Sequence, residues 1–248
     1  MTSPREIFLE VFEPLPRQGP GGFACTRRAL ALCRELPPSP RVLDLGCGAG
    51  AQTLHLAALL DGPILAVDLH EPLVERLRAK LDEAGLAGRV EARVGDMAAL
   101  DLPPESFDLV WSEGALYNLG LEVALPMCAG LLRPGGYLAF TDAVWRTTDP
   151  PPEVREAFAD YPTMGRVEDV RSLIEAHGLA LVDDFDLPRE AWWDDFYTPM
   201  ERRIAALRVE HAEDAQAIAA LDEIAAEPAM HRRSGHCYGY TFFVARRT

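Results

Sequence analysis

The stretch Val42-Leu-Asp-Leu-Gly-Cys-Gly-Ala-Gly50 decides the fold class. It begins as a short apolar strand and continues with glycine at positions 46, 48 and 50. Glycine permits a tight turn and lets a ligand approach bare backbone, and a helix N-terminus at that point favours an anionic group. The stretch therefore predicts a buried strand, a ligand-binding loop and a helix, in that order.

Strand-like and helix-like segments alternate from this stretch onwards, which is typical of a parallel sheet with crossover helices. The expected strands are Arg41–Leu45, Ile64–Asp68, Val90–Val94, Phe107–Trp111 and Tyr137–Thr141. The expected helices are centred on Thr53–Leu60, Pro72–Ala84 and Glu122–Leu132, and Thr26 is expected to cap an earlier helix through Cys33. After the fifth strand we expect a helix over Val167–His177, a strand over Leu179–Leu187, a helical segment over Pro199–Ala226 and a final strand over Tyr238–Arg246.

The glycines alone leave two ligand classes open. Gly46, Gly48 and Ala51 also satisfy the G-x-G-x-x-G/A pattern of dinucleotide sites. Asp68 would then be the acid that binds the ribose. A carboxylate beside a pyrophosphate is unfavourable, however, and Asp44 lies inside the strand just before the glycines. A ligand that carries an ammonium group fits this position better than NAD.

Further acids follow the next two strands. Asp68 ends the second strand, where a carboxylate can accept hydrogen bonds from both hydroxyls of a ribose. Asp96 and Met97 follow the third strand and suit the amino group and the apolar face of adenine. The carboxyl ends of parallel strands meet at one edge of a sheet, where open α/β sheets bind ligands.

Together with Leu132-Arg-Pro-Gly-Gly136, these motifs resemble the class I S-adenosylmethionine-dependent methyltransferases over residues 40–142. The resemblance implies an α/β fold with a seven-stranded, mostly parallel Rossmann-like sheet, an antiparallel last strand and helices on both faces. It also implies S-adenosylmethionine as cofactor and S-adenosylhomocysteine as product. The cofactor-binding residues that it implies are Gln18, Asp44, Gly46, Cys47, Gly48, Asp68, Leu69, Asp96, Met97 and Ser112.

The flanking sequence resembles a bacterial subgroup of small-molecule methyltransferases, some of them related to amine N-methyltransferases. The segments that carry this resemblance are Arg17–Gly21, Ser112–Gly120, Trp192–Pro199 and Tyr238–Phe243. We therefore expect one methyltransferase domain over residues 1–248. Its parts would be an N-terminal helical cap or lid (1–38), a cofactor-binding core (39–142) and a C-terminal part with a substrate-side insertion and the last strands (143–248).

Composition narrows the partners and the location. The chain has 248 residues and a formal net charge of −15, and nucleic-acid-binding proteins normally carry a basic face instead. The five cysteines are scattered without zinc-ligand spacing, and neither a signal peptide nor a membrane span is apparent. We expect a cytoplasmic protein without bound metal, while monomer and homodimer remain open.

The segment after the fourth strand faces the methyl group in this family, so Glu113, Tyr117 and Asn118 are the predicted catalytic residues. The (Asn/Asp/Ser)-Pro-Pro-(Tyr/Phe) motif of enzymes that methylate nucleic-acid bases or glutamine is absent there. Glu113 could remove a proton or hold an amine, or it could instead hydrogen-bond the N-terminal segment. Glu113 and Asp142 could also bind Mg²⁺, but no third ligand is visible in the sequence.

The expected activity is N- or O-methylation of a small molecule. The alternatives are a carbon methyltransferase of the quinone-biosynthesis type and a non-catalytic module that binds S-adenosylmethionine. Aromatic residues gather in the variable segments and could enclose an aromatic or amine substrate. The segment Arg17–Gly21 is either a lid over the cofactor or an ordinary linker.

Overall fold

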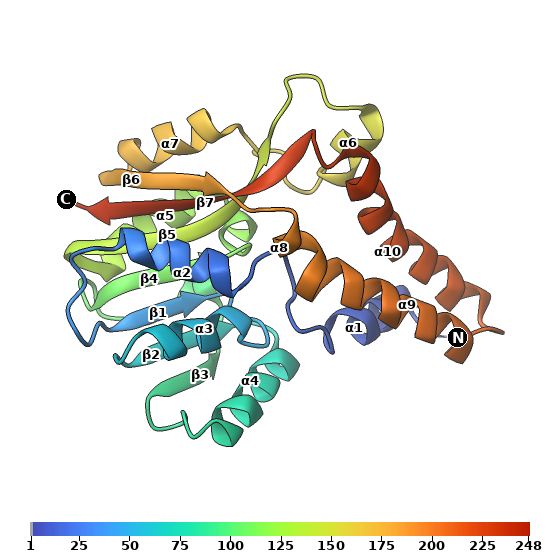
Figure 1. Ribbon diagram of the computed structural model, residues 1–248, viewed down its shortest axis with the longest axis horizontal. Helices are drawn as coiled ribbons and strands as arrows, with labels where there is room; N and C mark the ends of the chain where they lie inside the picture. The colour runs from blue at the N-terminus through green and yellow to red at the C-terminus, as the bar shows by residue number, and fades with distance from the viewer. Residues whose placement is uncertain (1) are drawn as a thin grey trace.

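The computed structural model describes residues 2–248, and Met1, the first residue of the expected N-terminal cap, lies outside them. Seven strands form one sheet in the order β3-β2-β1-β4-β5-β7-β6 (Figure 1). Their bounds are β1 (Val42–Leu45), β2 (Ile64–Asp68), β3 (Val90–Val94), β4 (Phe107–Glu113), β5 (Leu132–Trp145), β6 (Leu179–Asp186) and β7 (Tyr238–Arg247). Strand β7 runs antiparallel to both of its neighbours, and the other strand pairs are parallel. The predicted fold class is confirmed.

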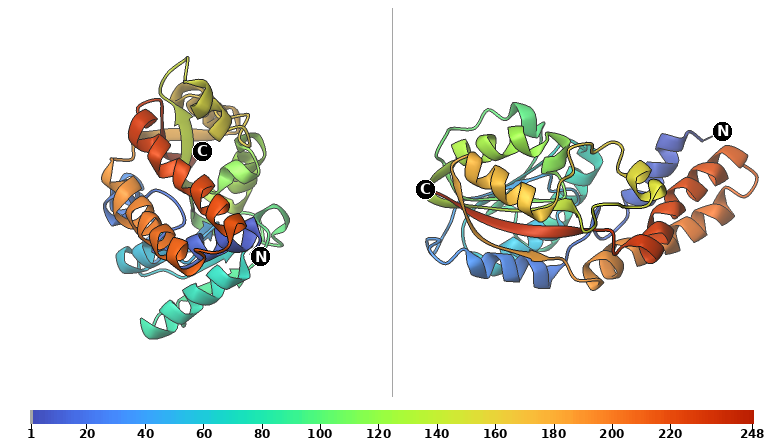
Figure 2. Two further views of the ribbon diagram at one scale, coloured as in Figure 1. Left: turned by 90° about the vertical axis from the view of Figure 1, so that its right-hand side faces the viewer. Right: turned by 90° about the horizontal axis from the view of Figure 1, so that it is seen from above.

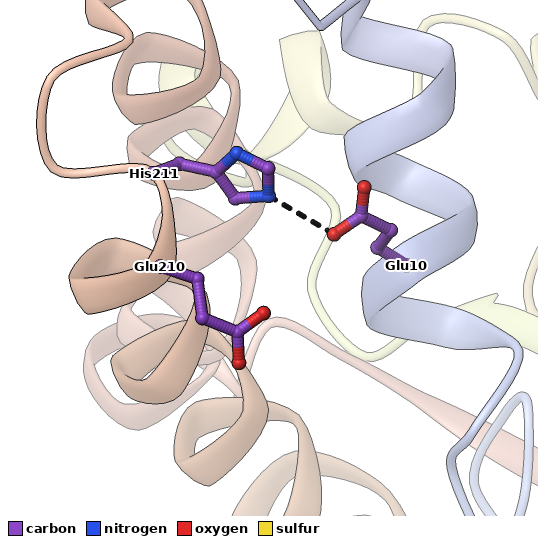
Figure 3. Close-up of side chains that lie close together, drawn as sticks. All are labelled: Glu10, Glu210 and His211. Atoms are coloured by element: carbon purple, nitrogen blue, oxygen red, sulfur yellow. Dashed lines mark hydrogen bonds and ion pairs between the residues drawn. The ribbon is translucent and has the colours of Figure 1, made fainter.

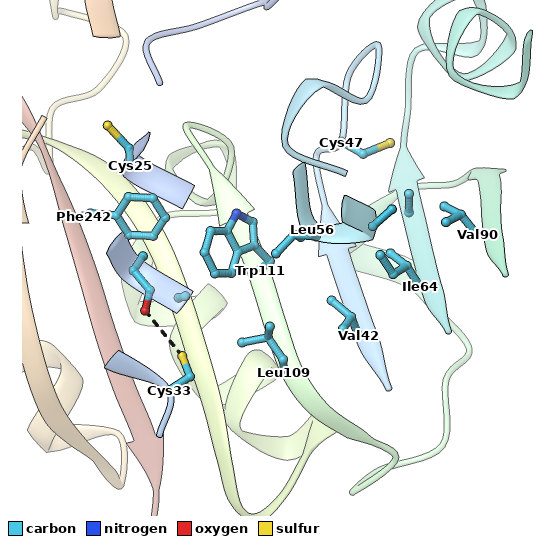
Figure 4. Close-up of a cluster of buried hydrophobic side chains, with 14 of the residues drawn as sticks. Cys25, Cys33, Val42, Cys47, Leu56, Ile64, Val90, Leu109, Trp111 and Phe242 are labelled. Carbon is cyan, nitrogen blue, oxygen red and sulfur yellow. Dashed lines mark hydrogen bonds between the residues drawn. The ribbon is translucent and has the colours of Figure 1, made fainter. Parts of the chain in front are cut away.

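Successive side chains of a strand point to opposite faces of the sheet. The buried strands therefore present apolar side chains to both faces, and helices cover each face. Val42 belongs to the core under α2 (Phe23–Leu32), α3 (Ala51–Leu59) and α4 (Glu71–Glu83). Figure 4 shows part of this core around Trp111. Leu43 belongs to the opposite core, under α5 (Leu121–Leu131) and α7 (Val167–Ala176).

A separate group of helices lies beyond the carboxyl ends of the parallel strands (Figures 1 and 2). Its members, from both ends of the chain, are α1 (Pro4–Phe12), α6 (Pro152–Ala157), α8 (Glu190–Trp192), the π-helical turn η3 (Trp193–Tyr197), α9 (Thr198–Glu210) and α10 (Ala215–Ser234). They enclose a third apolar core, which includes Ile7, Trp192 and Leu221. Two short 3-10 helices, η1 (Met97–Ala99) and η2 (Leu116–Asn118), follow β3 and β4.

Two helix boundaries differ from the sequence prediction. Helix α2 begins at Phe23 with Gly22 as its N-cap, and Thr26 lies one turn inside, with its hydroxyl oxygen 3.3 Å from the Gly22 carbonyl oxygen. The single helical segment expected over Pro199–Ala226 is two helices, because Asp214 accepts hydrogen bonds from the first N–H groups of α10 and starts a new helix there.

All five cysteines are buried and unpaired, and they pack as small apolar residues. Within residues 2–248, no helix has both the length and the apolar composition that crossing a bilayer requires.

Candidate functional site

A cavity of about 950 Å³ lies between the carboxyl edge of the sheet and the group of helices. The chain order reverses between β1 and β4, and open α/β sheets bind ligands at such a reversal. The predicted residues that line the cavity are Gln18, Gly46, Cys47, Gly48, Asp68, Leu69, Asp96, Met97, Glu113, Tyr117 and Asn118. Topology therefore brings eleven of the thirteen predicted residues to one space.

The loop after β1 presents bare backbone to this cavity. Gly46 and Gly48 have φ angles of 70° and 53°, which are accessible to glycine at little cost. A Cβ atom on Gly46 would lie 2.2 Å from the Ala115 Cβ, and one on Gly48 would lie 2.8 Å from the Gln18 Oε1. Both positions thus favour glycine for conformation, and Gly46 also requires it for space.

The Asp68 carboxylate fixes the shape of this loop. Its Oδ2 accepts a hydrogen bond from the Gly48 N–H at 2.8 Å, and its Oδ1 accepts one from the His70 N–H at 2.9 Å. Each carboxylate oxygen can accept more than one hydrogen bond. Asp68 therefore keeps acceptor capacity toward the cavity that it lines.

Asp96, Met97 and Leu69 form a second wall next to Asp68. Asp96 caps the short helix η1, where its Oδ1 accepts the Ala98 N–H at 2.8 Å. Leu69 is 70% exposed although it is a large apolar side chain. A carboxylate beside two apolar side chains suits a flat heterocycle that carries an amino group.

The N-terminal segment, residues 13–22, lies over the glycine-containing loop that follows β1. Gln18 accepts a hydrogen bond from the Ala49 N–H at 3.0 Å and donates to the carbonyls of Phe12 and Leu15, both at 3.2 Å. Its amide therefore connects the end of α1 to the loop after β1. Neighbouring Arg17 also lines the cavity, and its Nη1 atom is buried without a hydrogen-bond partner among residues 2–248.

Glu113 is held by three side chains at the end of β4. Its Oε2 accepts the Arg17 Nη2 at 2.6 Å, and its Oε1 accepts the Trp111 Nε1 at 2.9 Å and the Thr26 hydroxyl at 3.3 Å. The Glu113 side chain is 1% exposed. Of the two sequence interpretations, this geometry favours the one in which Glu113 anchors the N-terminal segment over the one in which it takes up a proton.

Asp44 and Ser112 are the two predicted residues that do not line the cavity. Asp44 is completely buried, and it accepts hydrogen bonds from the Thr53 hydroxyl at 2.6 Å and the Gln52 amide at 3.4 Å. Burial raises the pKa of Asp44 to about 7. The Ser112 hydroxyl donates to the Leu45 carbonyl at 2.8 Å. In this structure both side chains fix the ends of β1 and β4 behind the cavity wall.

Tyr117 and Asn118 lie on η2, directly after β4. The Asn118 amide donates to the Ala115 carbonyl at 2.9 Å, and the Tyr117 ring lies 5.5 Å from the ring of Tyr161. Burial raises the pKa of Tyr117, which keeps its hydroxyl protonated at neutral pH. Both residues are placed to contact a molecule in the cavity.

One group of possible metal ligands occurs within residues 2–248, and it lies outside the cavity. Glu10 on α1 faces Glu210 and His211 at the end of α9 (Figure 3). The His211 Nε2 lies 3.0 Å from Glu10, and the Arg203 Nη1 lies 3.4 Å from Glu210. The His211 contact joins α1 to the end of α9, and the Arg203 contact lies within α9. The sequence suggests Glu113 and Asp142 as possible Mg²⁺ ligands. In the structure Glu113 accepts a hydrogen bond from Arg17, and Asp142 accepts one from the Tyr161 hydroxyl.

Aromatic side chains line the end of the cavity away from the glycine loop. The sequence predicts aromatic residues around a substrate but does not identify all of the residues found here. Trp192, Phe196 and Tyr197 come from α8 and η3, while Tyr240 comes from β7. Glu227 of α10 lies among them, and nothing in the Ala- and Glu-rich sequence of this helix distinguishes it from its neighbours. Only the packing of α10 against α9 and α1 reveals its position.

Comparison with known proteins identifies the class of this fold. The family described as a methyltransferase domain matches residues 42–136. The chain is 30% identical over 151 residues to the O-methyltransferase cnsE of Penicillium expansum, covering 59% of this chain and 54% of that protein. It is 42% identical over 115 residues to the malonyl-[acyl-carrier protein] O-methyltransferase of Methylococcus capsulatus, covering 45% of this chain and 41% of that protein. The chain spans about half the length of these curated relatives.

The fold extends the similarity to the whole chain. A SAM-dependent methyltransferase from Geobacter sulfurreducens, solved with S-adenosyl-L-homocysteine, has a TM-score of 0.83 and 20% identity, with 100% of both chains covered. The sheet order and the cavity at the reversal point define a Rossmann-like α/β protein. Within that class, residues 42–136 match the methyltransferase domain family, and the whole chain has the fold of a solved SAM-dependent methyltransferase.

Proposed function

We propose that this chain transfers a methyl group from S-adenosylmethionine to the nitrogen or oxygen of a small-molecule acceptor and releases S-adenosylhomocysteine. One observation carries the proposal. Bare glycine backbone, the strand-end acids Asp68 and Asp96 and the guanidinium of Arg17 line a single ligand-sized cavity. The family and its named relatives support the same activity.

The residues present fit the groups of S-adenosylmethionine. The unpartnered Nη1 of Arg17 suits the carboxylate of the methionine part, and a Cβ at Gly46 or Gly48 would narrow the same region. Asp68 would accept the ribose hydroxyls, while Asp96 and Met97 would hold the adenine. Cys47 and Leu69 would line the bound cofactor, and Gln18 would hold the N-terminal segment in place.

The cofactor supplies an activated methyl group together with its own leaving group. The protein then has to align the acceptor and exclude water, effects worth up to about 7–11 kcal/mol in favourable cases. Tyr117 and Asn118 would contact the acceptor, because η2 follows β4 at the cavity wall. Glu113 would act through Arg17 as a positioning residue, since three donors already occupy its oxygens.

The shape and charge of the cavity support a small acceptor. The cavity continues beyond Asp68 and Asp96 into the aromatic end, which leaves room beside the cofactor and favours an enzyme over a module that only binds it. A net charge of −15 opposes binding to nucleic acid. We place the activity in the cytoplasm and assign residues 1–248 to one domain, with residues 1–38 as its cap.

The test is a screen of amines, alcohols and phenols with S-adenosylmethionine labelled in the methyl group. We expect label in at least one nitrogen or oxygen acceptor, and at least about tenfold less with the Asp68→Ala variant at a cofactor concentration below the wild-type dissociation constant. Transfer to carbon alone would favour the quinone-type alternative. Tight cofactor binding without transfer to any acceptor would favour the non-catalytic module.

A further inference from the structure

Glu227 is a carboxylate without a cationic partner at the aromatic end of the cavity. Its Oε1 accepts a hydrogen bond from the Tyr197 hydroxyl at 2.9 Å, and none of the ion pairs among residues 2–248 includes it. The side chain is accessible from the cavity that it lines. Burial of the surrounding region nevertheless raises the pKa of Glu227. A cation that enters the cavity could therefore pair with this carboxylate directly.

Aromatic rings surround the same carboxylate. The Trp192 ring lies 5.8 Å from the ring of Tyr197, 5.9 Å from that of Tyr238 and 5.3 Å from that of Tyr240. All four rings line the cavity. Burial, followed by the negative charge of Glu227, raises the pKa of Tyr197, so this charge is close to the aromatic wall. Aromatic rings attract cations through their π-electron density, most strongly where water is excluded.

Each of the other four carboxylates of the cavity has a basic side chain or a backbone N–H group as its partner. Glu13 faces His70, and Glu113 pairs with Arg17. Asp68 accepts the backbone N–H groups of Gly48 and His70, and Asp96 accepts that of Ala98. His231 stacks on Trp192, but burial and the nearby charge of Arg189 lower its pKa to about 4. His231 is therefore neutral at pH 7 and supplies no positive charge to Glu227.

We infer that Glu227 and the rings of Trp192, Tyr197, Tyr238 and Tyr240 form a binding site for an organic ammonium group. This inference rests on the proposed function where it assigns the ammonium group to the methyl acceptor. A protonated nitrogen has no lone pair with which to attack a methyl group. The ammonium held by Glu227 is therefore a binding handle, and the acceptor carries a second nitrogen or oxygen that receives the methyl group.

The experiment uses two matched pairs of probes that differ in charge and little in shape. Choline is compared with 3,3-dimethylbutan-1-ol, and benzylammonium with benzyl alcohol. Binding to the full chain is measured at pH 7.5 by calorimetry and by tryptophan fluorescence, with and without saturating S-adenosylhomocysteine. We expect at least one cation to bind about tenfold or more tightly than its neutral partner.

Variants then assign the selectivity to one residue. Glu227→Gln keeps an oxygen that can accept the Tyr197 hydrogen bond but removes the charge, and we expect it to abolish the preference for the cation. Glu223→Gln makes the same charge change one turn earlier on α10, at an exposed position outside the cavity lining, and we expect it to leave the preference unchanged. S-adenosylhomocysteine affinity should stay the same in both variants.

The outcomes separate this inference from the proposed function. Equal affinity for charged and neutral probes, absence of any binding, or full selectivity in Glu227→Gln would overturn the ammonium site. None of these results depends on methyl transfer. Conversely, a protein that selects cations through Glu227 but does not bind S-adenosylhomocysteine would retain the ammonium site and lose the proposed function.

Discussion

Three buried or half-buried aspartates show how the surroundings decide what one side chain does. Asp68 accepts two backbone N–H groups and still faces the cavity. Asp44 lies on the neighbouring strand, but Thr53 and Gln52 occupy its carboxyl group behind the wall. Asp142 is bonded on one side to the Tyr161 hydroxyl, and its Oδ1 has no partner within residues 2–248. The spacing of the motif alone does not separate these three environments.

The first prediction concerns Asp68→Ala. The variant should bind S-adenosylhomocysteine about 1.5–3 kcal/mol more weakly, because it loses charge-assisted hydrogen bonds to the ribose. The loop around Gly48 should also become less ordered, since Asp68 holds its N–H. Calorimetry measures the affinity and circular dichroism checks the fold. Unchanged affinity in a folded variant would place the ribose acid elsewhere.

The second prediction concerns stability and pH at Asp142. Burial raises the pKa of Asp142 to about 7, well above the ordinary value of an aspartate, so the folded state holds the proton more tightly than the unfolded state does. The contribution of Asp142 to the free energy of unfolding is therefore fully present at low pH, and it is lost as the pH rises from about 4 through 7.

Asp142→Asn cannot lose a proton and should escape this loss. Between pH 5 and pH 8 the unfolding free energy of the wild type should fall by about 2–3 kcal/mol more than that of the variant. Urea unfolding at both pH values measures the difference. Parallel pH profiles for the two proteins would show that Asp142 is not perturbed in this way.

At the scale of elements, the sequence predicts best what local pattern controls. Apolar runs place β2 and β3 at the observed residues, and the strand ends then bring Asp68 and Asp96 to one edge. Strand β5 was expected over Tyr137–Thr141 but spans Leu132–Trp145, because pairing with β4 and β7 extends it on both sides of the glycine turn. Glu227 was missed because contacts between helices distant in sequence determine its position.

The N-terminal segment is the element on which closure of the cavity depends. Arg17 reaches Glu113 at the end of β4, and the Gly21 N–H donates to the Ala191 carbonyl at 2.9 Å. A Cβ on Gly21 would lie 2.2 Å from the Arg17 Nη2 and 2.7 Å from the Glu113 Oε2. A Cβ on Gly19 would meet no atom within 4 Å. The two glycines thus form a natural matched pair.

The third prediction uses this pair. Gly21→Ala should displace Arg17 from Glu113 and weaken S-adenosylhomocysteine binding about tenfold or more, because it disrupts a buried charge-assisted hydrogen bond. Gly19→Ala should leave the affinity within about twofold, since the surface there is open. Hydrogen exchange over residues 13–22 should show protection by S-adenosylhomocysteine in the wild type and in Gly19→Ala, but not in Gly21→Ala. Equal exchange with and without the ligand in the wild type would identify the segment as a linker instead of a lid.

At the scale of the whole molecule, elements from both ends of the chain enclose one cavity. Helix α1 packs against α9 and α10, and the Thr2 N–H donates to the Asp214 carboxylate at 2.9 Å. The sheet carries the residues proposed for the cofactor, whereas the helices beyond its edge carry Glu227 and Trp192. One fold can host many different functions, because the function depends on the site that the fold carries.

The most direct test of the central claim compares S-adenosylhomocysteine with NAD as ligands of the purified chain. A ligand at about 100 times its dissociation constant adds about 2.7 kcal/mol, which raises the melting temperature of a chain of this size by several degrees. We predict such a shift, with matching calorimetric binding, for S-adenosylhomocysteine and no shift for NAD. A shift with NAD and none with S-adenosylhomocysteine would contradict the account.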